Sequence, residues 1–406
     1  MTRKTILIFD QAESAGGSIA RAVDLANEMD EFNFIFVTYH PLHELSNAQL
    51  ATHITAKRVY SFYNYAKKTD HRLFLESKTK NTILRLIGKK IIALADLINE
   101  YSVLWQTLFK IWPTKIDLVQ ANAGVHILPY RLAQRTNASL IYYFRHLDDY
   151  SWAEGKMLNR ASHCIFVGTN LMKAHLARLK NLPREKCSVV HSPFDVATRL
   201  ETEPQLDREI LNRLKQSGKK VIVCNSRLGV TKGQHIVIDA LKQLSPSWPE
   251  LVLVFVGSAS ATAEGVQYLE RLKKTVADYQ LEDRVIFLSH RHDPLHILLY
   301  ADIAVQAPTY FEALAGSLVE SLQLGIPTVS ADMGGSNEVL IDGSTGFLFP
   351  PGDHAALAEI IDRVLREPKL VEPIIEQGKA YALQKWSPQN ISAQMRTIYS
   401  AAVSAK

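Results

Sequence analysis

Two glutamates separated by seven residues occur in the stretch FEALAGSLVESLQLGIPTVS, residues 311–330. Glu312 follows an aromatic pair, and Glu320 lies among leucines and valines. The pattern predicts a helix that begins near Gly316, with Glu312 on the preceding loop and Glu320 inside the helix. A carboxylate in apolar surroundings is costly unless another group pairs with it. By spacing alone, the pair fits either a ligand site or an ordinary solvated helix.

The predicted helix start at Gly316, Ser317 and Leu318 is a candidate anion site. The first N–H groups of a helix have no partner within it, and the N-terminal end of its dipole is positive. An anion between two carboxylates is reasonable if those carboxylates bind hydroxyl groups. A nucleotide sugar meets this demand, with its diphosphate at the helix and its ribose and sugar hydroxyls on the glutamates.

A second candidate element is VIVCNSRLGVTKGQ, residues 221–234. Its apolar run predicts a strand, followed by a loop that carries Arg227, Lys232 and Gly233. Two cations at the carboxyl end of a strand suit a pyrophosphate and would stabilise the charge of a departing diphosphate. Taken alone, they equally fit solvated loop charges.

Short apolar runs alternate with helix-length segments along the whole chain. This pattern is typical of parallel sheets covered by helices. The runs are TILIFD, FNFIFVTY, DLVQAN, SLIYYFR, HCIFVGT and CSVVHS, then VIVCNS, LVLVFVG, RVIFLS, DIAVQAP, IPTVSAD and GFLFPP. We therefore expect two doubly wound α/β domains, residues 1–195 and 196–385, with ligands in the cleft between them. Residues 386–406 are predicted to form a helix that packs back on the first domain.

The composition is that of an ordinary globular protein. The 406 residues are 47% hydrophobic and 21% charged, with a formal net charge of +5, which does not indicate a nucleic-acid partner. Cys164, Cys187 and Cys224 show no CxxC spacing and fit core positions in a reducing compartment. No apolar run approaches the length of a membrane span or signal peptide, so a cytoplasmic location is expected.

Residues 57–115 form a basic segment between two predicted strands. Twelve lysines and arginines stand there against four acidic residues. Apolar residues at helical spacing, with cations roughly opposite, predict an amphipathic helix; they are Ile83, Ile87, Ile91, Leu94 and Ile98. Two interpretations remain open: a helix packed on its own sheet, or a surface that rests on an anionic membrane or holds a lipid-linked acceptor.

Several motifs, in order along the chain, resemble one known family. NSRLGVTKG, APTYFEALAGSLVESLQLGIPTVSADMGGSNEVL and GFLFPPGDHAALAEII are similar to the C-terminal half of family 4 retaining glycosyltransferases of GT-B fold. AGGSIARAVDLANEM is similar to that family's glycine loop and first helix. The resemblance covers nearly the whole chain and is strongest over residues 220–365.

The resemblance implies a role for each matching residue in the second half. Arg227 and Lys232 would hold the donor diphosphate, and Glu320 the ribose diol. Glu312 would bind the donor sugar and face the reacting carbon. Backbone N–H groups would come from a short run of residues, Ala315, Gly316, Ser317 and Leu318. This chain departs from the family in having alanine at 315, where glycine is common, and HSPFD where Asn-Gly is common.

In the first half, the resemblance points to a histidine and a glycine pair. His146, in IYYFRHLDD, matches the family's histidine near the acceptor and reacting sugar, although a structural histidine is the alternative. Gly16 and Gly17 would let the backbone approach a phosphate or an acceptor hydroxyl, although a simple turn also explains them.

Two further stretches match more weakly. VIFLSHRHD resembles the lining of the base pocket, which assigns His290 and Arg291 to donor binding. Gly334 and Gly335 resemble a loop whose backbone approaches the donor, with an ordinary turn as the alternative.

The predicted reaction is retaining transfer from a nucleoside diphosphate sugar to an acceptor hydroxyl. No Asp-x-Asp, HExxH or Cys/His ligand set occurs, so neither a metal nor another cofactor is expected. The acceptor would be a saccharide or lipid-linked molecule in bacterial polysaccharide or glycolipid assembly, at the inner face of the membrane. The alternatives are a nucleotide-sugar epimerase of related fold and a non-catalytic membrane-associated binding protein.

Overall fold

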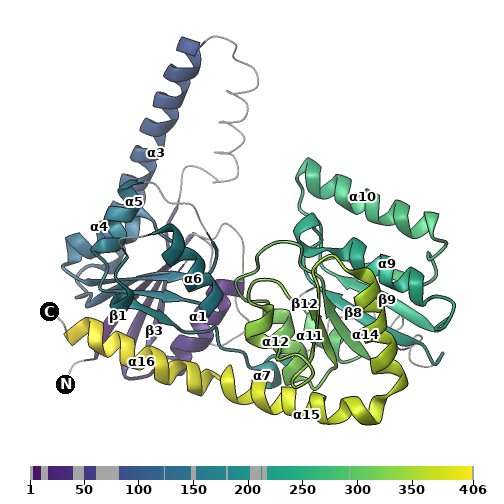
Figure 1. The fold of residues 1–406 in the computed structure, drawn as a ribbon. Helices are drawn as coiled ribbons and strands as arrows, with labels where there is room; N and C mark the ends of the chain where they lie inside the picture. The colour runs from purple at the N-terminus through teal and green to yellow at the C-terminus, as the bar shows by residue number, and fades with distance from the viewer. Residues whose placement is uncertain are drawn as a thin grey trace. The chain divides into compact units, whose positions relative to one another are not determined.

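The chain divides into two compact units, each of α/β type (Figure 1). The computed structural model describes residues 3–10, 17–39, 50–60, 82–122, 124–147, 152–179, 182–201, 212, 217–291 and 293–404. Unit 1 comprises Met1–Val167, Met172–Ser192 and Ile391–Lys406. Unit 2 comprises Gly168–Leu171 and Pro193–Asn390.

The described part of unit 1 is built on a parallel sheet with the order β3-β2-β1-β4-β5-β6-β7. The strands are β1 (Lys4–Asp10), β2 (Phe32–Thr38), β3 (Ile54–Arg58), β4 (Leu118–Ala121), β5 (Ser139–Phe144), β6 (His163–Phe166) and β7 (Cys187–Val189). The helices are α1 (Gly17–Asn27), α3 (Thr82–Ile111), α4 (Ile127–Thr136), α5 (Trp152–Asn159) and α6 (Thr169–Arg178), whose first residues are grouped with unit 2.

The C-terminal helix α16 (Pro388–Ser404) begins at a proline, which suits the first turn of a helix. From Ile391 onward, its residues belong to unit 1. The hydroxyl of Tyr399, which is fully buried, donates to Oε1 of Gln120 in β4 at 2.7 Å. Ser139 at the start of β5 donates to the carbonyl of Ala402 at 2.6 Å. These contacts join the end of the chain to the middle of the first sheet.

The described part of unit 2 is also built on a parallel sheet, with the order β10-β9-β8-β11-β12-β13. The strands are β8 (Lys220–Asn225), β9 (Leu251–Val256), β10 (Val285–Leu288), β11 (Ile303–Gln306), β12 (Thr328–Ala331) and β13 (Phe347–Phe349). The helices are α7 (Val196–Leu200), α9 (Gln234–Leu244), α10 (Ala263–Asp278), α11 (Pro294–Leu298), α12 (Gly316–Gln323), α13 (Ser336–Val339), α14 (His354–Arg366) and α15 (Pro368–Lys385).

The central strands of unit 2 are buried on both faces, as their apolar runs predict. Successive side chains of a strand point to opposite faces of the sheet. Leu253 and Phe255 belong to one hydrophobic core, whereas Val252 and Val254 belong to another. The prediction of α/β architecture with two parallel sheets is therefore confirmed.

Strand order reverses direction at one point in each described sheet. In unit 1 this point lies between β1 and β4, and in unit 2 between β8 and β11. The loops that leave neighbouring strands there turn in opposite directions, so an open space forms at the carboxyl ends. Ligands in doubly wound sheets bind at such places, which directs attention to the residues that follow these four strands.

Two features of the first unit differ from expectation. The edge strand β3 was not predicted, and it places Lys57 and Arg58 in the sheet instead of in an insertion. The helix predicted within the basic segment is present as α3. Its described apolar residues Ile91, Leu94 and Ile98 are 62%, 59% and 58% exposed, however, so they do not pack on the sheet.

Candidate functional site

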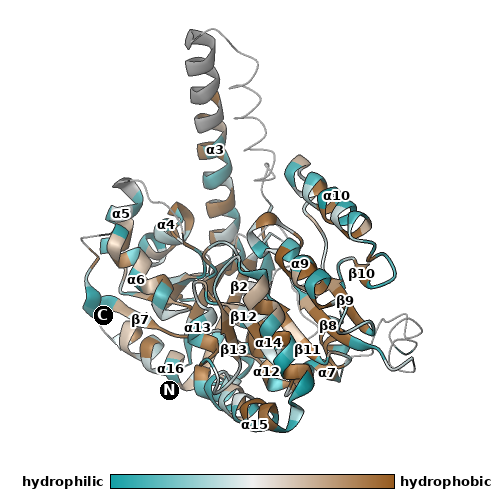
Figure 2. Cartoon of the chain, turned by 45° about the vertical axis from the view of Figure 1, so that its right-hand side comes forward, coloured by the Kyte–Doolittle hydropathy of each residue, from teal (hydrophilic) through white to brown (hydrophobic). Residues whose placement is uncertain are grey.

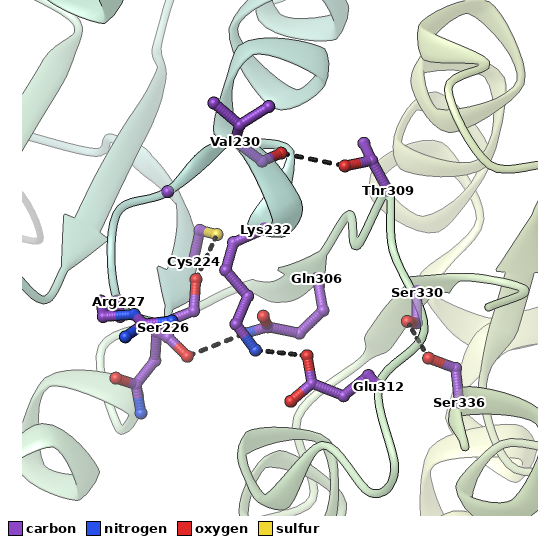
Figure 3. Close-up of polar contacts among 12 residues, drawn as sticks. Cys224, Ser226, Arg227, Val230, Lys232, Gln306, Thr309, Glu312, Ser330 and Ser336 are labelled. Atoms are coloured by element: carbon purple, nitrogen blue, oxygen red, sulfur yellow. Dashed lines mark hydrogen bonds and ion pairs between the residues drawn. The ribbon is translucent and has the colours of Figure 1, made fainter. Parts of the chain in front are cut away.

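A lysine and a glutamate meet at the point where strand order reverses in unit 2. Lys232 closes a short 3-10 helix, Val230–Lys232, that follows β8. Glu312 lies on the loop between β11 and α12. The Lys232 Nζ donates a hydrogen bond to Oε2 of Glu312, and the two side chains are only 22% and 24% exposed (Figure 3). The predicted candidates are therefore neighbours, although 80 positions separate them.

Backbone contacts hold the two loops side by side. Thr309 donates from its N–H to the carbonyl of Thr231 at 3.0 Å. Its hydroxyl donates to the carbonyl of Val230 at 2.9 Å, as Figure 3 shows. Gly233 has φ +65°. A Cβ at this position would lie 1.9 Å from the carbonyl oxygen of Ala307, so only glycine allows the loops to approach this closely.

This close approach gives a stability prediction. We expect Gly233→Ala to lower the free energy of unfolding by about 2 kcal/mol more than Gly343→Ala does. Gly343 is a matched control, because its φ is +68° but a Cβ added there would have no heavy atom within 4 Å. Both variants carry the penalty for a left-handed alanine, about 1 kcal/mol, and only Gly233→Ala adds a clash. Urea unfolding measures the difference, and equal losses would contradict the contact with Ala307.

Gln234 organises the loop that carries Arg227. This glutamine is fully buried at the start of α9. Its Nε2 donates to the hydroxyl of Ser226 and to the carbonyl of Arg227, both at 3.0 Å, and its Oε1 accepts from the N–H of Gly229 at 3.3 Å. The Arg227 side chain is exposed, and its guanidinium makes no ion pair within the described part of unit 2. Sequence reasoning missed Gln234; its place directly after the Lys-Gly turn was the available signal.

The loop of Glu312 is also shaped by the Gly334–Gly335 pair. A Cβ at Gly334 would lie 2.3 Å from the Glu312 carbonyl oxygen, and one at Gly335 would lie 2.2 Å from that of Ala313. The Gly335 N–H donates to the Glu312 carbonyl at 2.6 Å. These glycines therefore allow two backbone segments to pack closely. This close packing explains why glycine is present at both positions without invoking a ligand.

Helix α12 begins at Gly316, as predicted. Ala315 precedes it in an extended conformation and is buried, and Ser317 is half-buried. The N–H of Leu318 donates to the Ala315 carbonyl at 3.0 Å, so this amide already has an acceptor. The loop that carries Glu312 leads directly into α12, whose first residue, Gly316, comes four positions later.

Glu320 is 7% exposed and forms an ion pair with Arg199 of α7, with 2.5 Å between Oε1 and Nη1. Arg199 is positioned by its own short helix, which Asp195 caps by accepting from the N–H of Thr198 at 3.1 Å. The preceding Phe194 is held by its N–H, which donates to the carbonyl of Trp386 at 2.8 Å. Sequence reasoning missed Arg199, because nothing local marks a partner 121 positions away.

The two weaker donor-site candidates follow β10. His290 is exposed, and its N–H donates to the hydroxyl of Ser258, which follows β9, at 2.8 Å. Arg291 pairs with Asp293 at 3.1 Å, and Asp293 is only 4% exposed. Both residues therefore lie at the carboxyl edge of the sheet, but Arg291 also has a structural partner.

The remaining candidates belong to unit 1. His146 is exposed and follows β5, Gly17 is the first residue of α1, and Gly16 lies outside the described residues. The structure adds a buried polar cluster at this edge of the first sheet, which the sequence did not lead us to expect. Its described members lie at, or shortly after, the carboxyl end of a strand; they are Asp10, Asn122, Arg145 and Ser192.

Side-chain hydrogen bonds link the members of the polar cluster. Asn122 donates to Asp10 at 2.5 Å, and Arg145 donates to Asn122 at 3.3 Å and to Ser192 at 2.6 Å. Asp10 is the last residue of β1 and Asn122 directly follows β4, and strand order in unit 1 reverses between these two strands. The sequence offered a signal for three of these residues, since Asp10, Asn122 and Arg145 each directly follow an apolar run.

Neither a thiolate nor a metal centre is found at this site in the described residues. Burial raises the pKa of the Cys224 thiol, at the end of β8, to about 12, so it stays protonated at neutral pH. The described residues contain no group of three or more His, Cys, Asp or Glu side chains placed to hold a metal ion. Fixed cations and backbone amides are the groups that unit 2 offers to an anion.

Comparison with known proteins is consistent with this chemistry. Residues 207–381 match the family model of the glycosyl transferases, group 1. The chain is 25% identical over 282 residues to a GDP-mannose-dependent alpha-(1-6)-phosphatidylinositol monomannoside mannosyltransferase of Mycolicibacterium smegmatis, covering 66% of this chain and 72% of that protein. It is 25% identical over 252 residues to an alpha-D-kanosaminyltransferase of Streptomyces kanamyceticus, covering 61% of this chain and 62% of the relative.

Solved structures share the fold over nearly the full length. The Anabaena protein HepE, crystallised with UDP-glucose, matches with a TM-score of 0.74 and 22% identity, covering 98% of this chain and 99% of that chain. A glycosyltransferase from Rickettsia africae matches with a TM-score of 0.73 and 17% identity, with full coverage of both chains. At these identities the likeness concerns the fold.

Proposed function

We propose that this GT-B chain, whose residues 207–381 belong to the group 1 glycosyl transferases, moves a sugar from a nucleoside diphosphate to an acceptor hydroxyl. One observation carries the proposal: Lys232 and Glu312 meet where strand order reverses in the unit that matches the family. A cation for the diphosphate and an acceptor of hydrogen bonds for sugar hydroxyls are thereby provided at one place.

The donor would bind along the carboxyl edge of the second sheet. Arg227 and Lys232 would neutralise the diphosphate, with help from the N-terminal turn of α12. Glu312 would then release Lys232 in part and accept hydrogen bonds from the sugar. Glu320 would bind the ribose diol, and the loop with His290 and Arg291 would lie beside the base.

The reaction we propose is metal-independent and retains the anomeric configuration. The bond between the anomeric carbon and the phosphate oxygen breaks first, and positive charge develops on the sugar ring. The acceptor oxygen then bonds to the same face of that carbon, and its proton passes to the departing phosphate oxygen. Arg227 and Lys232 stabilise the negative charge gained by the diphosphate. His146 would lie near the acceptor.

The acceptor class is inferred from the relatives. The mannosyltransferase named above acts on a phosphatidylinositol mannoside, and another relative is a capsular polysaccharide biosynthesis glycosyltransferase of Staphylococcus aureus, 25% identical over 48% of this chain. We infer that the acceptor here is a saccharide or a lipid-linked saccharide of a bacterial envelope, glycosylated on the cytoplasmic side.

Thermal unfolding with a panel of nucleoside diphosphate sugars tests the donor assignment. The correct donor at a hundredfold excess over its Kd should stabilise unit 2 by about 2.7 kcal/mol, which raises Tm by several degrees. The matching nucleoside diphosphate should retain part of this shift, and the free sugar should give none. A panel without any shift, together with no transfer to any acceptor, would contradict the proposal. An isomerised donor in the absence of acceptor would indicate an epimerase instead.

A further inference from the structure

Helix α3 of unit 1 carries a continuous line of exposed apolar side chains. Six of them, each at least 58% exposed, define what we call the α3 stripe: Ile91, Leu94, Ile98, Trp105, Phe109 and the adjoining Trp112. The steps between them are three, four, seven, four and three residues, which places them on one side of a helix. Brown segments recur along the part of α3 that is coloured in Figure 2.

The α3 stripe is not the face by which the helix packs on its own unit. Val103, Leu104, Thr107 and Ile111 are at most 4% exposed and hold the C-terminal half of α3 against the protein. The helical spacing puts these residues on a different side from the stripe. Helix α3 thus has two apolar sides, one buried and one exposed. A protein that only needed to fold would have polar residues on the second side.

Cations gather where the α3 stripe ends. Arg58 and Lys110 lie over the ring of Tyr60, with 5.1 Å and 5.4 Å to its centroid, and Tyr60 is itself 58% exposed. Lys110 also donates to the carbonyl of Arg58. Lys115 is 84% exposed, with only a 3.8 Å contact to Asp117. Basic residues beside exposed aromatic rings are typical of surfaces that lie at the boundary between lipid headgroups and acyl chains.

We propose that the α3 stripe docks this protein on the surface of an anionic phospholipid bilayer. No described helix is long and apolar enough to cross a membrane. Because the exposed apolar side chains run along one side of α3, this helix would lie along the membrane surface. Phe109, Trp112 and Trp105 would enter the headgroup region, and the neighbouring cations would contact lipid phosphates. A second copy of the chain is a poorer occupant, because it would bring the same excess of positive charge to the contact.

Vesicle flotation with the full chain tests this proposal. The vesicles contain phosphatidylcholine alone or phosphatidylcholine with about one third phosphatidylglycerol. The wild-type protein should float with the anionic vesicles and much less with the neutral ones, and added salt should weaken the binding. The double substitution Phe109→Ser, Trp112→Ser should lower the partition coefficient by at least about tenfold.

Matched variants distinguish a specific effect of the α3 stripe from non-specific hydrophobic binding and from misfolding. Leu370→Ser removes a side chain of α15 that is 70% exposed, and it should leave flotation unchanged. Lys115→Gln should weaken anionic binding, whereas Lys274→Gln, on a lysine 74% exposed in α10, should not. Circular dichroism checks the fold, and Ile91→Ser with Leu94→Ser provides a second stripe variant.

Three results would overturn the proposal: no flotation of the wild type, flotation of the double variant equal to wild type, or a dimer in light scattering that the double variant loses. The last would assign the α3 stripe to contact between copies. Donor binding to unit 2 does not enter this test, so its outcome is independent of the proposed reaction.

Discussion

Replacing Lys232 by alanine will lower the rate of glycosyl transfer by roughly a hundred- to a thousandfold. The lysine is the cation that the fold places at the reversal of strand order, and its ammonium group is held in position by Glu312. In the proposed reaction, its removal would leave only the exposed Arg227 and the helix amides to stabilise the departing diphosphate. The loss should appear mainly in kcat, because the diphosphate gains negative charge only as the bond to the sugar breaks.

A loss of fold is the competing explanation for such a result, and a matched lysine excludes it. Lys220 lies at the opposite end of β8 and pairs with Asp302 at 3.2 Å. Lys220→Ala also removes a lysine–carboxylate ion pair from unit 2, and each substitution should change the free energy of unfolding by only about 1 kcal/mol. Transfer should persist in Lys220→Ala. A Lys232→Ala enzyme within a fewfold of the wild-type rate would remove Lys232 from the donor site.

The fold was largely predictable from the sequence because its signal is local. Strands such as LVLVFV are apolar at successive positions, and only burial on both faces of a sheet satisfies that pattern. Strand β3 was not predicted because it lacks such an apolar pattern. Its residues ITAKR are mostly exposed at a sheet edge, so a half-polar segment was assigned to the basic insertion. Edge strands bury too little to leave a clear pattern.

The positions of Lys232 and Glu312 after strand ends were predictable from the sequence, but the pairing of these two side chains was not. Lys232 and Glu312 were both expected at strand ends, yet the ion pair between them depends on β8 and β11 being neighbours, which follows from strand order. Arg199 was not predicted, because it meets Glu320 only after its short helix has packed within unit 2. Such contacts are properties of the packed chain, and no local pattern encodes them.

For α3, the helix itself was predictable from the sequence, but what covers its apolar faces was not. Its apolar periodicity was read correctly as a helix, but periodicity does not tell which neighbour covers an apolar face. Ile98 and Val103 are both apolar residues of one helix, and one is 58% exposed while the other is fully buried. Only the packed structure distinguishes a face that serves folding from one that is left for a partner.

Glu320→Gln will remove the ability of the protein to distinguish a ribose diol from its deoxygenated counterpart. We expect the wild type to bind the correct nucleoside diphosphate about ten- to a hundredfold more tightly than its 2′,3′-dideoxy analogue, the value of one charge-assisted hydrogen-bond pair. The glutamine variant should bind both with similar Kd in calorimetry. Glu320 is suited to this role because it is 7% exposed, so water competes little for its oxygens.

Arg199 gives this prediction its control. The arginine pairs with Oε1 of Glu320 at 2.5 Å, so removing it tests whether diol binding depends on the carboxylate or on the arginine. Arg199→Ala leaves the carboxylate buried without this cation, and we expect a larger loss of Tm than in Glu320→Gln, where the charge itself is removed. The arginine variant should still prefer the diol, because the carboxylate remains. If Glu320→Gln instead keeps the wild-type preference, the carboxylate serves only to bind Arg199, and the ribose must be recognised by other groups of the second sheet's carboxyl edge.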